Sequence, residues 1–319
     1  MAAASPLDPP LDPSVTLGSV TLPAPVMTAS GTAGHGAELA PYLPLDQLGA
    51  VVVKSLAAFE WAGNPAPRVH PAGVGMINAV GLQGPGVEHW RLHELPALLA
   101  TGARVVASIW GRSVDDYRRA AEQLADAPAQ VVAVEVNLSC PNLEGRRGIF
   151  AHDPVLSAEV IAATAAAGRP RWAKLSPNTD RVVEVASAVA EAGSEVVTLV
   201  NTLLGMVLDP LTGAPVLGAG GGGYSGRGIH AVAVRTVYDV HAALPDLPII
   251  GVGGVASGWD AAELLLAGAR AVQVGTATFA DPKAPLRVQR ELLAWCSGRG
   301  VAPSHLCGLA HRGGLPPRG

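Results

Sequence analysis

The residues best suited to chemistry stand at the end of one apolar run, VVAVEVNLSCPN, which covers Val131–Asn142. The run is typical of a buried parallel strand, and it ends in the amides of Asn137 and Asn142 and the thiol of Cys140. Pro141 cannot continue a strand ladder, so the chain should turn there and hold the thiol over the strand's end. Such a thiol can serve as a general base if its neighbours favour the thiolate. The alternative is a small buried cysteine among ordinary turn residues.

Two later apolar runs end in small residues that could hold a phosphate. PIIGVGG ends in Gly253 and Gly254, and AVQVGTA carries Gly275 and Thr276. Glycines let backbone N–H groups approach an anion, and the loops after the seventh and eighth strands of a barrel commonly do this. Either pair alone could be a simple turn, but together they predict a phosphate site. The chain has no GxGxxG after a first strand, which argues against a Rossmann dinucleotide site.

Two lysines and four amides complete the candidate set. Lys54 and Lys174 each end an apolar run, and because lysine is rarely buried unpaired, they point to a ligand anion unless they are merely solvated. The amides could hydrogen-bond a planar ring from several sides; they are Asn78, Asn137, Asn142 and Asn201. We find no Ser-His-Asp pattern, HExxH or Walker lysine. The set therefore suggests a phosphate-bearing cofactor stacked over a small planar substrate.

Eight short apolar runs must position these groups, and each ends in polar or glycine residues: 25–31, 50–55, 104–111, 131–142, 171–178, 196–202, 248–254 and 271–277. Segments with helical periodicity lie between most of them, at 114–125, 154–167, 181–192, 231–243 and 259–267. This alternation predicts a (β/α)8 TIM barrel, with a doubly wound sheet as the alternative. In a barrel the ends of all the runs share one rim, where active sites are built.

Two connections, 56–102 and 203–247, are too long for simple crossovers, so we expect long loops over the C-terminal rim. The second contains the glycine-rich stretch Gly218–Gly228, which we expect to be mobile and to act as a lid.

Composition narrows the class of protein. At 319 residues with 49% hydrophobic and 15% charged residues, the chain is long enough for one large globular domain. We expect a flexible proline-rich leader at 1–16, a single barrel domain at 17–300 and a flexible C-terminal tail at 301–319. A net charge of −4 without a basic run argues against a nucleic-acid-binding surface.

The chain shows no signal peptide and no run that could span a bilayer, so we expect a cytoplasmic protein. Its three cysteines lack ligand spacing, which predicts no metal, cluster or disulfide framework here.

Four motifs taken together resemble one family. NLSCPN, with NAVGLQGPG (78–86), VNTLLGM (200–206) and IIGVGGV (249–255), is similar to the dihydroorotate dehydrogenase family, in particular its class 1B catalytic subunit. The resemblance runs from about Leu17 to Pro282. It implies an FMN-containing barrel that oxidises dihydroorotate to orotate in pyrimidine biosynthesis. The membrane-bound class 2 relatives have serine at the position of Cys140.

The resemblance also implies roles for individual residues. Cys140 corresponds to the catalytic base. The implied flavin contacts are Ser30, Lys54, Ser55, Ser108, Asn137, Lys174, Val200, Gly226, Gly253, Gly254, Gly275 and Thr276. The implied substrate contacts are Lys54, Asn78, Ala79, Val80, Gly81, Leu82, Asn137, Asn142, Asn201 and Thr202. Two features depart from the family pattern: Ser108 replaces the asparagine usual in class 1B, and the 218–228 stretch is unusually rich in glycine.

The implied mechanism has Cys140 remove the C5 proton of dihydroorotate while the C6 hydride passes to flavin N5. Lys174 would then stabilise negative charge at the N1/O2 edge of the reduced flavin. Class 1B subunits form a homodimer core and pair with an electron-transfer subunit that carries FAD and a 2Fe-2S cluster and reduces NAD. The alternatives are a class 1A enzyme that uses fumarate, a related dihydropyrimidine flavin oxidoreductase and a non-catalytic phosphate-binding barrel. The last would show no flavin absorbance.

Overall fold

The computed structural model describes residues 11–139, 141–142 and 148–315. Eight parallel strands form one ring in the order β3-β16-β15-β12-β11-β8-β7-β4. Backbone and side-chain bonds close it between β3 and β4, where Gly49 N donates to Val26 O at 2.8 Å and Val52 N donates to Thr28 Oγ1 at 2.9 Å. The predicted (β/α)8 barrel is confirmed. In chain order the strands are β3 (Val26–Thr28), β4 (Val51–Val52), β7 (Val105–Ile109), β8 (Val131–Asn137), β11 (Arg171–Lys174), β12 (Val196–Leu199), β15 (Ile249–Val252) and β16 (Ala271–Val274).

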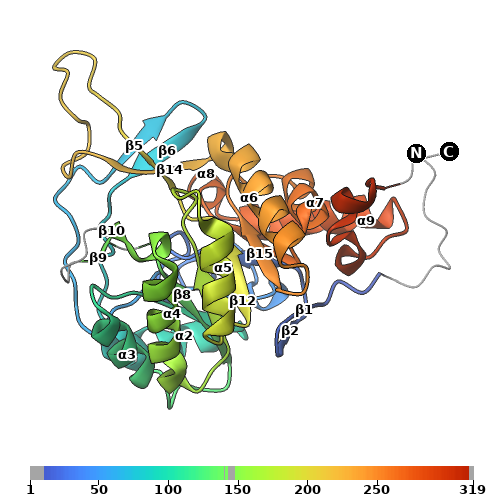
Figure 1. Cartoon of the computed structure of the whole chain (residues 1–319), viewed down its shortest axis with the longest axis horizontal. Helices are drawn as coiled ribbons and strands as arrows, with labels where there is room; N and C mark the ends of the chain where they lie inside the picture. Colours follow the sequence, from blue (N-terminus) through green and yellow to red (C-terminus); the bar gives the residue numbers. More distant parts are fainter. Residues whose placement is uncertain (1–10, 140, 143–147, 316–319) are drawn as a thin grey trace.

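Helices surround the ring on its outer side (Figure 1). They are α1 (Val87–His93), α2 (Leu95–Leu99), α3 (Val114–Glu122), α4 (Pro154–Ala163), α5 (Val182–Glu191), α6 (His230–Ala243), α7 (Gly258–Ala267), α8 (Ala277–Ala280) and α9 (Ala284–Ser297). Side chains cap two of these helices: Asp153 accepts from the first turn of α4, and Ser257 from that of α7. The helix expected at 154–167 ends at Ala163 and continues as a 3-10 turn, η3 (Thr164–Ala167).

The amino end of the barrel is filled by apolar side chains. Every strand of the ring contributes one residue to a buried cluster that includes Met27, Trp172 and Ile250. A hairpin of β1 (Val15–Leu17) and β2 (Val20–Leu22) adds Leu17 and Leu22, both fully buried, to the same cluster. This packing closes one end of the barrel, so polar groups can gather only at the carboxyl ends of the strands.

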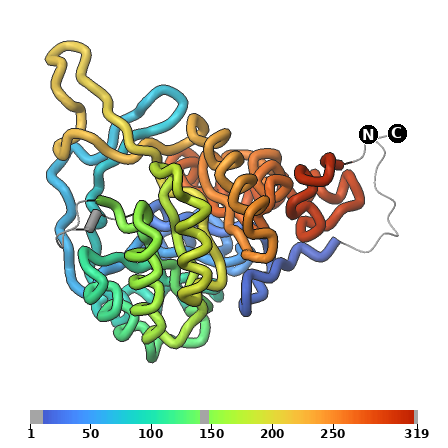
Figure 2. Tube along the Cα trace, in the orientation of Figure 1, coloured from blue at the N-terminus to red at the C-terminus, as the bar shows by residue number. Residues whose placement is uncertain are grey.

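The two long connections pair with each other. The first forms the hairpin β5 (Val69–Ala72) and β6 (Gly75–Asn78), and the second supplies β13 (Leu203–Gly205) and β14 (Gly222–Gly226). Together they make an antiparallel sheet in the order β13-β14-β6-β5. Figure 2 shows the light-blue hairpin and the gold segment side by side beyond the barrel.

Part of the glycine-rich stretch is a strand and not a loop, because its residues 222–226 form a central strand of this sheet. The glycines fit because neighbouring atoms leave no room for a side chain. A β-carbon would lie 2.3 Å from the Asn78 carbonyl oxygen at Gly222 and 2.1 Å from Thr202 Oγ1 at Gly223. At these positions glycine is required because the neighbouring segments approach closely, and not only because it gives the backbone freedom.

The remaining elements are short. They are η1 (Leu45–Gln47), η2 (Phe150–His152), η4 (Arg227–Ile229), and β9 (Pro141–Asn142) paired with β10 (Gly148–Ile149). After α9, η5 (Pro303–Leu306) and η6 (Leu309–Arg312) pack against α7, and Leu306 is fully buried. Among the described residues, no helix is both long and apolar enough to cross a membrane.

Candidate active site

Buried polar side chains from four strands meet inside the barrel. Lys174 of β11 is 4% exposed, and its Nζ donates to Ser30 Oγ at 3.1 Å and to Gln273 Oε1 at 3.3 Å. Glu135 of β8 is fully buried and places Oε1 3.8 Å from that ammonium. Gln273 Nε2 and Thr198 Oγ1 donate to the other oxygen, Oε2, at 2.7 and 3.2 Å. The lysine is therefore held against a carboxylate beneath the rim.

The sequence prediction did not include two residues of this cluster: Glu135, the partner of Lys174 in the ion pair, and Gln273, which is hydrogen-bonded to both. Their signal was a charged or amide residue inside an otherwise apolar strand, VVAVEVN and AVQVG. A buried charge requires a partner, so Glu135 could have been paired with Lys174 on the neighbouring strand. Glu135 Oε1 accepts no hydrogen bond from any described residue. That orphaned oxygen and an ammonium with a third N–H suit a polar ligand edge lying above them.

A second network joins four predicted residues from four strand ends. Ser55 and Ser108 share a hydroxyl–hydroxyl bond of 2.9 Å, and Asn137 Nδ2 donates to Ser55 Oγ at 3.3 Å. Asn201 Nδ2 donates to Asn137 Oδ1 at 3.4 Å. The Tyr117 hydroxyl donates to the Asn137 carbonyl at 2.6 Å and anchors the end of β8. The structure thus brings these predicted residues into one wall of the site.

The predicted phosphate residues are adjacent, because β15 pairs with β16. Gly253 and Gly254 have φ of 134° and 70°, which favour glycine, and a β-carbon on Gly254 would lie 2.6 Å from His230 Cβ. Thr276 Oγ1 donates to Ser225 Oγ at 2.8 Å, which ties the end of β16 to β14 next to Gly226. These glycines and Gly275 form a cradle of the kind that backbone N–H groups offer to phosphate.

The predicted substrate loop, Asn78–Leu82, lies beside the second long connection. Asn78 Nδ2 donates to the Gly223 carbonyl at 3.2 Å, and Thr202 packs against Gly223. Leu82 has φ of 61° and is the one non-glycine residue with a positive φ among those described. The four-stranded sheet therefore joins the 78–82 loop to Thr202.

Lys54 follows β4 at the same rim, and its backbone N–H donates to the Gly34 carbonyl at 2.9 Å. The nearby His35 was not singled out from the sequence, where nothing marks it. Burial, and then the positive charge of Lys54, lower the pKa of His35 to about 4. A neutral imidazole thus accompanies the Lys54 ammonium near neutral pH.

Cys140 lies outside the described residues, as does the Asn142 side chain. Their surroundings are partly described: Ser139 N donates to Asn137 Oδ1 at 3.2 Å, and β9 pairs with β10. Val200, another predicted flavin contact, is buried and donates its N–H to the Val252 carbonyl at 2.8 Å.

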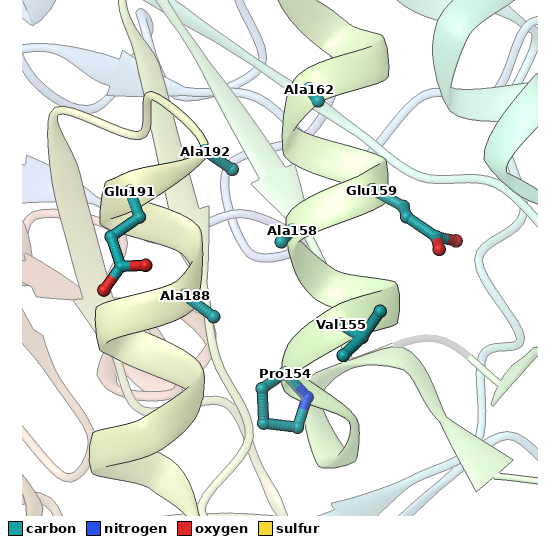
Figure 3. Close-up of a pocket in the computed structure, with 8 residues that line it drawn as sticks. All are labelled: Pro154, Val155, Ala158, Glu159, Ala162, Ala188, Glu191 and Ala192. Carbon is teal, nitrogen blue, oxygen red and sulfur yellow. The ribbon is translucent and has the colours of Figure 1, made fainter.

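A groove on the outer surface is unrelated to this rim. It lies between α4 and α5, where Ala158 and Ala162 face Ala188 and Ala192 (Figure 3). Its apolar lining reflects close packing of two helices. The part of the chain that the structure describes has no group of three His, Cys, Asp or Glu side chains that could hold a metal ion.

Comparison with known proteins gives one consistent match. The family model described as dihydroorotate dehydrogenase matches residues 14–295. The chain is 44% identical over 303 residues, 94% of its length and 98% of the relative's, to a "Dihydroorotate dehydrogenase B (NAD(+)), catalytic subunit" from Desulforudis audaxviator. A protein of the same name from Geobacter sp. is 43% identical over 282 residues, 88% of this chain and 92% of the relative. A "Putative dihydroorotate dehydrogenase A (fumarate)" from Solibacter usitatus is also 43% identical, over 289 residues, 90% of this chain and 94% of the relative.

Proposed function

The chain belongs to the dihydroorotate dehydrogenase family, and we propose that it oxidises dihydroorotate to orotate with a flavin mononucleotide held on the carboxyl-end rim of its barrel. The observation that carries the cofactor proposal is the meeting of two features at one rim. The buried Lys174–Glu135 pair lies beneath it, and the glycine cradle of β15 and β16 borders it.

The residues present fit a flavin mononucleotide. Gly226, Gly253, Gly254, Gly275 and Thr276 would hold its phosphate through backbone N–H groups and one hydroxyl. The third N–H of Lys174 would go to the polar edge of the ring, whose negative charge in the reduced state it would stabilise. Bound there, the flavin would supply the hydride acceptor. Ser30, Lys54, Ser55, Ser108, Asn137 and Val200 would complete the contacts.

The substrate would lie over the amide wall. Four amides offer donors and acceptors on several sides of a planar ring: Asn78, Asn137, Asn142 and Asn201. Lys54 would offer a positive charge to the carboxylate of dihydroorotate. Ala79–Leu82 and Thr202 would border it. Cys140 would take the C5 proton as the general base.

For the electron acceptor we propose NAD, reached through a partner subunit that carries FAD and a 2Fe-2S cluster, with this chain as a homodimer core. Support comes from the relatives whose names contain "NAD(+)" and "catalytic subunit". A fumarate-using enzyme is the second candidate, because the Solibacter relative carries that name at comparable identity.

One spectroscopic series tests these proposals. We expect the purified chain to be yellow and to be bleached by dihydroorotate without oxygen. We expect NAD to reoxidise it poorly until the partner subunit is added, and fumarate to reoxidise it poorly in either case. A colourless chain with no FMN binding would refute the cofactor proposal. Efficient NAD reduction by the isolated chain would refute the need for a partner, and fast fumarate turnover would favour the second candidate.

A further inference from the structure

Trp61, in the connection between β4 and β5, makes three hydrogen bonds to the segment 81–84: one to Gly81 in the predicted substrate loop and two to Gly84 just beyond it. The backbone N–H of Trp61 donates to the Gly84 carbonyl at 2.9 Å, and the backbone N–H of Gly84 donates to the Trp61 carbonyl at 3.0 Å. Its indole Nε1–H donates to the Gly81 carbonyl at 2.9 Å. The three bonds clamp the loop on both sides of Leu82.

The clamped turn has an unfavourable backbone. Leu82 has φ of 61°, in the left-handed region that residues with a β-carbon rarely adopt. Such a conformation persists only where the surrounding structure over-determines it, and it commonly occurs at ligand sites. The Trp61 bonds supply this constraint, because they fix Gly81 and Gly84 on either side. Asn64 adds bonds of 3.1 Å from its backbone N–H to Val80 O and from Nδ2 to Ala79 O.

The indole itself is held in place by aromatic neighbours. The rings of Phe59, Trp61 and Trp110 meet edge to face, with centroids 6.1–6.2 Å apart. The Arg112 guanidinium lies 4.5 Å from the Phe59 ring and 5.2 Å from that of Trp61. These contacts fix the orientation of the indole, so its N–H points at Gly81 before any ligand arrives.

We propose that Trp61 is a positioning residue that presets the 79–84 loop in the conformation that receives dihydroorotate. This rests on the proposed function, in which Ala79–Leu82 border the substrate. Because all three bonds go to the loop and none to the glycine cradle, the clamp should govern substrate affinity. Flavin binding and the rate of the chemical step at saturation should not depend on it.

The test removes one N–H from each of two neighbouring tryptophans. Trp61→Phe keeps the ring and loses the donor to Gly81. Trp110→Phe is the matched control, since it belongs to the same ring cluster and its buried Nε1 has no hydrogen-bond partner among the described residues. We expect Trp61→Phe to weaken orotate binding and raise KM for dihydroorotate by roughly 2- to 10-fold, the effect of one lost neutral hydrogen bond. Its kcat and flavin content should stay near wild type, and Trp110→Phe should bind orotate like wild type.

Hydrogen exchange without ligand gives a second readout that does not depend on turnover. The Gly84 amide keeps its bond to the Trp61 backbone carbonyl in Trp61→Phe, but loss of the indole bond to Gly81 should loosen the loop, so this amide should exchange faster in Trp61→Phe than in wild type or Trp110→Phe. If Trp61→Phe fails to fold, Trp61→Tyr also removes the indole donor and undergoes the same measurements.

Three results would overturn the proposal: unchanged orotate affinity in Trp61→Phe, equal losses in both phenylalanine variants, or a lower kcat with unchanged affinity. The proposed function fails differently, through a wild-type protein that neither binds orotate nor is bleached by dihydroorotate.

Discussion

At the scale of single residues, the floor of the site depends on one buried ion pair. Lys174 and Glu135 are almost completely enclosed, and Gln273 bonds both of them. A buried pair adds little net stability over an apolar pair, but losing one partner leaves an uncompensated charge. Glu135 thus allows the charged side chain of Lys174 to be buried beneath the rim.

We predict that Glu135→Gln lowers the free energy of unfolding by about 3 kcal/mol or more, because the Lys174 ammonium stays buried without its counter-charge. Thr198→Val is the control, since it removes a hydroxyl bonded to the same carboxylate and should cost only about 1 kcal/mol. Denaturant unfolding measures both. Equal stability of Glu135→Gln and wild type would show that the pair is dispensable.

For Cys140 we predict that alanine slows flavin reduction by about 10²–10⁴-fold, the usual contribution of a positioned base, while flavin remains bound. Cys140→Ser should keep some activity, shifted to higher pH, because a hydroxyl is harder to deprotonate than a thiol.

The other two cysteines serve as controls. Cys296 is buried in α9, and burial raises its pKa to about 11. Burial also raises the pKa of Cys307, whose thiol donates to the Gly268 carbonyl at 3.3 Å. Both thiols stay protonated near neutral pH, so alanine at either position should leave the rate unchanged. Stopped-flow bleaching checks all four variants, and a wild-type rate in Cys140→Ala would remove the thiol from the mechanism.

At the scale of elements, the sheet β13-β14-β6-β5 determines where the substrate loop lies. It joins segments far apart in the chain, and its central strand β14 is built largely of glycine. The close contacts at Gly222 and Gly223 show that the sheet depends on small residues to bring Asn78 and Thr202 together.

Gly223→Ala is predicted to weaken orotate binding while leaving the flavin bound. Its β-carbon would lie 2.1 Å from Thr202 Oγ1 and 2.7 Å from Thr202 Cβ, so β14 or Thr202 must move. Gly205→Ala in the adjacent β13 is the control, because its nearest neighbours lie at ordinary contact distances of 3.5 and 3.7 Å. Orotate titration compares the two variants, and equal affinities would argue against a steric role for Gly223.

At the scale of the whole molecule, the barrel places its polar groups at one end because the β1–β2 hairpin and eight apolar side chains fill the other. Folding also buries His35, whose Nδ1 lies 3.8 Å from Glu94 Oε2 and whose backbone N–H donates to Glu38. Its pKa, lowered to about 4, makes the stability of the fold dependent on pH.

The direction of this dependence follows from the depressed pKa. Below about pH 6.5 the unfolded chain protonates His35, whereas the folded chain does not until about pH 4. The contribution of the neutral His35 to the stability of the fold is therefore fully present above pH 6.5 and is lost as the pH falls toward 4. We predict that His35→Phe reduces the fall in Tm between pH 6.5 and 4. Parallel Tm curves for His35→Phe and wild type would contradict the prediction.

The barrel could be predicted from the amino-acid sequence, because the alternation of strand and helix periods is a local pattern that can be recognised without knowledge of tertiary contacts. The sequence also placed Lys174, Asn137 and the glycine pairs at strand ends, and the geometry of parallel strands then puts those ends on one rim. Which side chains come into contact depends on long-range packing, which local sequence patterns do not contain. Asn78 and Gly223, 145 residues apart, are joined when the two long connections pair, and the glycine stretch becomes a strand for the same reason. Trp61 likewise reaches Gly81 through packing that no local period encodes.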